Sequence, residues 1–132
     1  MTDRPASFSA LGDERFVSLT TFRRNGLPVP TAVWVARDGA DLVVITPDGS
    51  GKVKRVRHDG RVELRPCSRT GAVAEGAPSF AGHAALTDET GTSRVRELIR
   101  RKYRVEYPVV MLIERIAARE RKPRIGLRIT AA

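Results

Sequence analysis

The chain has 132 residues, enough for one domain with a single hydrophobic core, and its 41% hydrophobic content excludes wholesale disorder. It carries 24 Lys and Arg against 15 Asp and Glu, and the resulting formal charge of +9 predicts an anionic partner. A single cysteine, Cys67, excludes an internal disulfide and favours a reducing compartment. Because neither a signal-peptide pattern nor an apolar run of ~18 residues is present, we expect a cytoplasmic protein without a membrane span.

Three strands are predicted in the first third of the chain. Residues 16–22 are rich in Val, Thr and Phe, and an Asn-Gly pair then gives a strong hairpin signal. The return strand spans 29–36, where Pro30 indicates a sheet edge or a bulge. A second tight turn leads to a strand at 41–46. We therefore expect a β-meander.

A short basic helix is predicted after the third strand. Ser50 suits its N-cap position, and Val53 and Val56 lie three residues apart on one face. Asp59 and Gly60 end it. The two valines are expected to face the core.

The remaining elements complete a small barrel. Further strands are expected at 61–67, 79–87 and 124–130. Thr87 or Asp88 caps a helix over 88–103, and a second helix starts at Pro108. The apolar side of that second helix comprises Val109, Leu112, Ile113 and Ile116. The expected fold is mainly β: a single antiparallel barrel domain over 1–132, with two or three helices.

The strand at 29–36 is apolar on both faces. Successive side chains of a strand point in opposite directions. One face comprises Val29, Thr31, Val33 and Val35, and the other comprises Pro30, Ala32, Trp34 and Ala36. The strand at 41–46 shows the same property. Since a one-layer barrel should be polar on its outer face, we expect a partner subunit, a flat ligand or both to cover the second face.

The start of the basic helix is a candidate phosphate site. A helix N-terminus presents free backbone N–H groups and the positive end of the helix dipole. Ser50 and Thr46 supply hydroxyl groups there, while Lys52 and Arg55 lie three residues apart on adjacent turns. The alternative is a solvated amphipathic helix whose charges bind nothing.

Several segments carry a family resemblance that spans most of the chain. They are TTFRRNGLP (20–28), PTAVW (30–34), TPDGSGKVKR (46–55), RVELRPC (61–67), RKY (101–103) and GLRIT (126–130). The sequence resembles the split β-barrel superfamily of pyridoxamine-phosphate-oxidase-like proteins. Within it, the sequence is most similar to the actinobacterial flavin/deazaflavin oxidoreductases that use coenzyme F420. Relatives commonly follow the RKY segment with Gly, where this chain has Arg104.

The resemblance implies an F420-dependent enzyme and a set of binding residues. Lys52 and Arg55 would bind the cofactor phosphate, assisted by Thr46 and Ser50. The residues implied to line the deazaflavin ring are Thr31, Ala32, Val33 and Trp34. The family is dimeric, with cofactor sites at the subunit interface. Reduced F420 would deliver a hydride to a small organic acceptor, and no protein side chain is expected to carry the chemistry.

Charge distribution favours F420 over flavin mononucleotide (FMN), which remains the alternative. FMN carries one phosphate, which two cations and a helix end satisfy. F420 carries a phosphodiester and a tail of several glutamates, which need an extended cationic track. Lys54, Arg57 and Arg61 would extend the track beyond the phosphate.

Two other site classes find little support in the sequence. His58 and His83 are the only histidines, and His83 has no paired Cys, Asp or Glu nearby, so no metal is expected. The charge is compatible with nucleic-acid binding, but there are only seven aromatic residues, mostly at core-like positions, and these offer few stacking platforms. We therefore expect no nucleic-acid partner.

Overall fold

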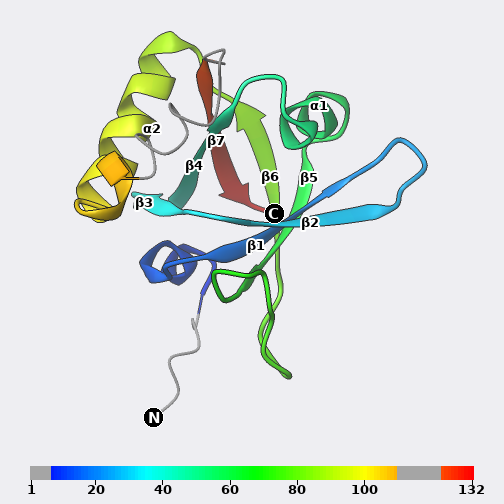
Figure 1. The fold of residues 1–132 in the computed structure, drawn as a ribbon. Helices are drawn as coiled ribbons and strands as arrows, with labels where there is room; N and C mark the ends of the chain where they lie inside the picture. The colour runs from blue at the N-terminus through cyan, green and yellow to red at the C-terminus, as the bar shows by residue number, and fades with distance from the viewer. Residues whose placement is uncertain (1–6, 110–122) are drawn as a thin grey trace.

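The computed structural model describes residues 7–109 and 123–132, which form a curled antiparallel sheet flanked by helices (Figure 1). Its strands are β1 (Val17–Phe22), β2 (Pro28–Val33), β3 (Ala36–Asp38), β4 (Asp41–Pro47), β5 (Arg61–Pro66), β6 (Phe80–Leu86) and β7 (Arg124–Ala131). The helices are a 3-10 turn, η1 (Ser9–Asp13), and the α-helices α1 (Gly51–His58) and α2 (Glu89–Lys102). None of the described helices is long and apolar enough to cross a membrane. The mainly β barrel expected from the sequence is confirmed.

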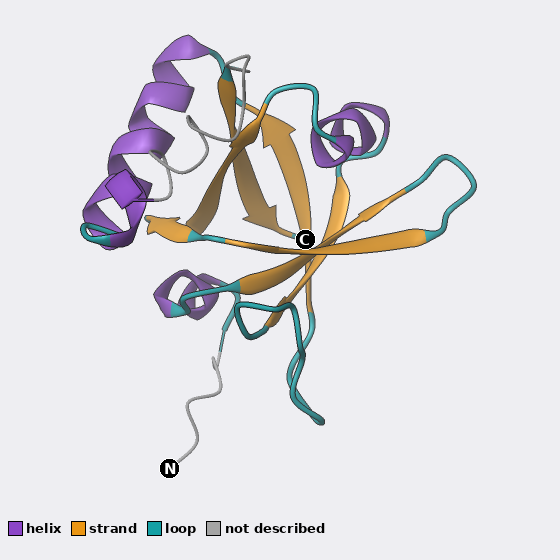
Figure 2. Ribbon diagram, viewed as in Figure 1, coloured by secondary structure: helices purple, strands orange, loops and turns teal. Residues whose placement is uncertain are grey.

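Strand order differs from a meander. The seven strands of the described chain run β2-β1-β5-β6-β7-β4-β3, so β2 and β3, which are consecutive in sequence, lie at opposite edges of the sheet. β2 pairs with β1, and β3 pairs with β4 in a separate hairpin. The predicted strand at 29–36 is therefore two strands, and the predicted meander is wrong. The chain crosses between the two edges at Trp34 and Val35, and the curled sheet brings these edges toward each other (Figure 2).

The crossover is fixed by Lys102, the last residue of α2, and by Tyr103, its C-cap; we call these two residues the α2 clamp. The Val35 N–H donates to the Tyr103 hydroxyl at 3.1 Å, and the Val35 carbonyl accepts from Lys102 Nζ at 2.6 Å. Lys102 also donates to the carbonyls of Gly12 and Glu14, and Tyr103 donates to the Arg15 carbonyl at 2.7 Å. The backbone groups of Val35 are thus satisfied by side chains in place of a sheet partner. The α2 clamp joins the crossover to the segment that precedes β1.

Two hydrophobic clusters lie on opposite faces of the sheet. The inner cluster fills the barrel and includes Leu19, Leu64 and Leu127. The outer cluster packs α2 on the sheet; its buried members are Ala36, Val43, Val95, Ile99 and Tyr103. The Trp34 ring stacks on Tyr103 with centroids 4.4 Å apart and joins this cluster. The expectation that a partner or ligand covers the second face is therefore wrong for Ala36 and Val43, which α2 of the same chain buries; for the partly buried Trp34 and Ile45 it stays a prediction.

The predicted helix starts are largely confirmed. Ser50 is the N-cap of α1, and Val53 and Val56 are buried beneath that helix. Asp88 caps α2 by accepting from the Gly91 N–H at 2.8 Å. The helix expected from Pro108 begins two residues earlier, at 106, and is helical through 109. Its predicted apolar residues Leu112, Ile113 and Ile116 lie outside the described residues.

Candidate functional site

The N-terminus of α1 is placed by the end of β4. A turn with Gly49 at φ 87° leads to Ser50, whose extended backbone opens the helix. The Ser50 side chain makes no capping hydrogen bond; its hydroxyl lies 3.4 Å from that of Thr46. No acidic residue occupies the first turn. The first N–H groups of α1 and two adjacent hydroxyl groups therefore remain to bind an anion.

Lys52 and Arg55 stand beside this helix end in an environment of positive charge. Burial lowers the pKa of Lys52, and the charges of Arg55 and Arg124 lower it further. The pKa of Arg55 is lowered by burial and by Arg23. Within residues 7–109 and 123–132, neither Lys52 nor Arg55 forms an ion pair with a carboxylate. Such a cluster favours the binding of an anion, because an anion offsets both repulsion and burial.

A hydrogen bond orients Arg55 toward the sheet. Its Nε donates to the Thr21 hydroxyl at 2.6 Å, and Thr21 is a buried residue of β1. The Arg55 guanidinium also lies over the start of α1, since a Cβ added at Gly51 would stand 2.8 Å from Arg55 Nη1. Arg55 is therefore held against both β1 and the helix N-terminus. The hydrogen bond between Arg55 and Thr21 was not predicted from the sequence.

The other predicted basic residues lie elsewhere on the surface. Lys54 is exposed, and Arg57 is 3.5 Å from Asp48. The Arg61 guanidinium lies 4.0 Å from the centroid of the Phe22 ring. Their place in a cationic track stays a prediction.

Two arginines near the site were missed by sequence reasoning. The positive charge of Arg23 lowers the pKa of Arg55, and that of Arg124 lowers the pKa of Lys52. Arg124 opens β7 opposite Pro47, at the end of β4 that leads to α1. The sequence did predict the last strand, which contains Arg124, but local sequence does not show that this strand pairs with β4 beside α1.

The exposed edge of β2 is the second part of the candidate site. Proline has no N–H, so Pro28 and Pro30 fit positions whose N–H points away from β1. Ala32 shares their alternation, and its backbone N–H and C=O therefore face the unpaired edge. The neighbouring Thr31 and Val33 direct their backbone groups toward β1. Ala32 thus offers one donor and one acceptor to a flat ligand.

The other predicted ring-lining side chains have different surroundings. Val33 is buried in the inner cluster, and Trp34 packs between the sheet and α2. The loop after β5 approaches Ala32, since a Cβ added at Gly71 would lie 3.9 Å from Ala32 Cβ. The role of these residues at a cofactor ring stays a prediction.

Thiol and metal chemistry find no support in the described residues. Burial raises the pKa of the Cys67 thiol, which disfavours the reactive thiolate. No group of three or more His, Cys, Asp or Glu residues in the described ranges could hold a metal ion.

Comparisons with known proteins agree on one fold. The family profile described as pyridoxamine 5′-phosphate oxidase matches residues 4–132. The crystal structure of a conserved hypothetical protein from Mycobacterium tuberculosis is 25% identical, with a TM-score of 0.66 over 98% of this chain and 86% of that chain. No curated protein matches the sequence significantly.

Two further solved structures share the fold at lower identity. An F420 reductase is 15% identical, with a TM-score of 0.59 over 97% of this chain and 95% of its own. An FAD-binding protein from Mesorhizobium loti is 17% identical, with a TM-score of 0.58 over 92% of this chain and 82% of its own.

Proposed function

Because the chain belongs to the pyridoxamine 5′-phosphate oxidase family, we propose that it is an oxidoreductase using the reduced deazaflavin coenzyme F420 to reduce a small organic acceptor. Members of this family are mostly oxidoreductases, and the fold binds flavin-type cofactors. The site around α1 supports a cofactor of this kind.

The observation that carries the proposal is the cation cluster at the start of α1. Lys52 and Arg55 would hold the cofactor phosphate, with the Thr46 and Ser50 hydroxyls and the first N–H groups of α1. The half-buried Lys52 has no carboxylate partner within the described ranges, so the residues present fit a phosphate. The cofactor, when bound, supplies the hydride, and the protein binds and orients it.

The backbone of Ala32 would align the polar edge of the cofactor ring. One N–H and one C=O on the same strand edge match a ring that carries an adjacent acceptor and donor. β2 is paired along its other edge with β1, which fixes the position of these groups. The role of the strand is therefore to orient the ring without contributing a catalytic side chain.

Excess positive charge favours F420 over FMN. A single phosphate requires fewer cations than the three contributed by Arg23, Lys52 and Arg55. The acidic tail of F420 would use the remaining charge. FMN is the second candidate, because the helix end with Lys52 and Arg55 is sufficient for one phosphate.

We further propose that the working form is a homodimer. Leu27 is 55% exposed, and Pro28 and Pro30 beside it are also exposed at the edge of the barrel. A second copy of the chain would cover this apolar edge and enclose the cofactor ring near Ala32.

Cofactor titration tests the proposed function. Oxidised F420 added to the purified protein should bind at micromolar concentration and change its fluorescence, and FMN should bind more weakly. Lys52→Ala should weaken F420 binding by about 10- to 100-fold, because a charge-assisted hydrogen bond contributes about 1.5–3 kcal/mol.

A matched control isolates the site from net charge. Arg24→Ala removes one exposed positive charge from the β1–β2 turn and should leave F420 affinity unchanged. Thermal unfolding of both variants should resemble that of the parent protein. If F420 does not bind at micromolar concentration, or if both variants weaken it equally, the proposed function is wrong.

A further inference from the structure

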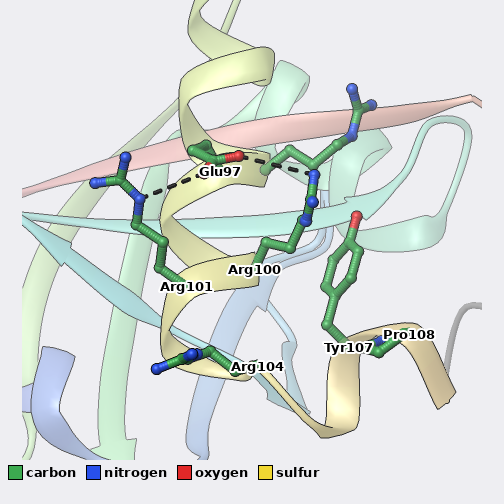
Figure 3. A pocket seen from close by; sticks show the side chains of 7 residues that line it. Glu97, Arg100, Arg101, Arg104, Tyr107 and Pro108 are labelled. Atoms are coloured by element: carbon green, nitrogen blue, oxygen red, sulfur yellow. Dashed lines mark hydrogen bonds and ion pairs between the residues drawn. The ribbon is translucent and has the colours of Figure 1, made fainter.

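A second cationic site lies on α2, where a groove of about 810 Å³ opens to solvent (Figure 3). Its lining residues are Arg96, Glu97, Arg100, Arg101, Arg104, Tyr107 and Pro108. Arg96 and Arg100 lie one helical turn apart, about 6 Å along the axis, and Arg104 follows just beyond the helix. The sequence analysis did not identify this groove, although four arginines within nine residues were its signal.

The groove holds more positive charge than its own carboxylate balances. Glu97 lies 3.9 Å from Arg100 and 3.3 Å from Arg101, so one carboxylate is shared by two guanidinium groups. Arg96 and Arg104 form no ion pair with any described residue. An anionic ligand would relieve the repulsion among these side chains.

We propose that the groove binds the carboxylate groups of a small organic polyanion. The planar guanidinium fork matches a carboxylate in a two-point contact. Arg100 and Arg101 already each pair with one oxygen of Glu97, whose side chain lies between theirs in Figure 3. Tyr107 and Pro108 add a less polar wall suited to a carbon skeleton.

The position of Glu97 argues against a nucleic-acid backbone as the ligand. A polyphosphate strand would bring several negative charges against this carboxylate, which lines the groove. Tyr107, the one aromatic residue lining the groove, is 6.5 Å from Trp34 in a tilted arrangement and stands within the α2 packing. The groove therefore suits a compact carboxylate ligand better than a chain of stacked bases.

Arg124 connects the groove to the cations at α1. Burial lowers the pKa of Arg124, Tyr107 opposes that effect, and the charge of Arg96 lowers the pKa further. Arg124 in turn acts on Lys52. Arg124 thus lies within electrostatic range of a cation of each site. A ligand carboxylate bound in the groove would belong either to the acidic end of a ligand held at Lys52 or to a separate molecule.

Citrate is the probe that tests the groove. Calorimetric titration at constant ionic strength should show saturable binding that Arg104→Gln and Arg100→Gln each weaken about tenfold or more. Arg69→Gln, an exposed charge change in the loop after β5, should bind citrate as the parent does. Far-UV circular dichroism should show that every variant retains its fold.

Glu97→Gln gives the decisive contrast. Removing the competing carboxylate should tighten citrate binding several-fold, whereas a purely structural role for Glu97 predicts weakening or no change. Equal citrate affinity in Arg104→Gln and Arg69→Gln, unchanged or weaker binding in Glu97→Gln, or an oligonucleotide binding in preference to citrate would overturn the proposal.

Competition distinguishes the two sources of carboxylate. If F420 with its glutamate tail displaces citrate while FMN does not, the groove binds the acidic end of the cofactor. If neither displaces it, the groove binds a separate carboxylate ligand. Because citrate binding is measured without any cofactor, failure of the proposed function leaves this test intact.

Discussion

Lys52 and Arg55 differ from the other basic residues of α1 in what surrounds them. Lys54 is exposed and Arg57 has Asp48 nearby, so water and a carboxylate compensate their charges. Lys52 is half-buried among cations, and its pKa is lowered. An exposed charge gains little from one more partner in water, whereas a half-buried cation gains more. Burial, more than charge count, therefore marks the candidate site.

Asp38 is the acidic counterpart of this argument. Its carboxylate accepts from Arg94 at 2.9 and 3.1 Å and from Arg128 at 2.6 Å, joining β3 to α2 and β7. These contacts lower the pKa of Asp38 to about 2 from 3.8, because both arginines favour its charged form. Protonation in the folded state thus requires stronger acid than in the unfolded chain.

We expect the contribution of Asp38 to folding to be lost in acid. It is fully present above about pH 4 and disappears as pH falls through about 2. Asp38→Asn should lower the free energy of unfolding at pH 7 by about 1–2 kcal/mol, with the difference from the parent vanishing near pH 2.

Urea unfolding at several pH values measures this difference. Asp13→Asn is the control, because the Asp13 side chain is 72% exposed and its ion pair with Arg37 lies at the surface. It should change the free energy of unfolding by less than about 0.5 kcal/mol. A pH-independent difference for Asp38→Asn would show that its ion pairs do not stabilise the fold.

At the scale of elements, α2 covers one face of the sheet and also sets the path of the chain. Its apolar side packs on β3 and β4, while the α2 clamp holds the crossover from β2 to β3. The same helix presents its arginines to solvent in the groove. One element therefore holds the crossover after β2 and also carries the arginines of the proposed carboxylate-binding groove.

Loss of the α2 clamp should destabilise the protein markedly. Lys102→Met leaves the carbonyls of Gly12 and Glu14 without the ammonium group that binds them. We expect the free energy of unfolding to fall by about 3 kcal/mol. Lys54→Met, the same change at an exposed position, should cost less than about 0.5 kcal/mol.

Tryptophan emission gives a local measurement beside chemical denaturation. Trp34 is the single tryptophan of the chain, and it stacks on the neighbouring Tyr103. The native emission of Lys102→Met should shift if the crossover loosens. An unchanged stability and spectrum would mean that the clamp does not hold the crossover.

Local sequence predicted most elements because each carries its own signal. Alternation and turn residues identified the strands, and apolar spacing with Ser50 or Asp88 identified the helices. The pairing order failed because the break at Trp34 and Val35 is stabilised by residues of α2, far along the chain.

The candidate site divides in the same way. Thr46, Ser50, Lys52 and Arg55 are neighbours in sequence, so their grouping followed from a strand that leads into a helix. Arg23, Thr21 and Arg124 join them only through sheet pairing. The groove on α2 was missed because exposed arginines on a helix are ordinarily solvated, and the turn that completes the groove lies beyond the helix.

At the scale of the whole molecule, the exposed β2 edge leads to a prediction about assembly. Light scattering should give twice the chain mass of 14.5 kDa. Leu27→Lys should shift the protein toward the monomer, because it places a charge in the proposed interface, and it should weaken F420 binding, because the interface encloses the ring. The fold of one chain should be retained, since Leu27 is 55% exposed and is not part of the core. Leu27→Met is the control and should remain dimeric. A monomer that binds F420 with parent affinity would contradict the proposed interface.

Strand order also has a consequence for biosynthesis. β2, β1, β5 and β6 are contiguous in the sheet, whereas β4 and β3 reach them only through β7. Because chains emerge from the ribosome N-terminus first, a four-stranded fragment and a separate β3–β4 hairpin form before β7 is available to join them. Until that strand emerges, Leu42 and Val44 have no neighbours across the ladder on that side, and the nascent protein exposes two unjoined halves to the quality-control machinery of the cell.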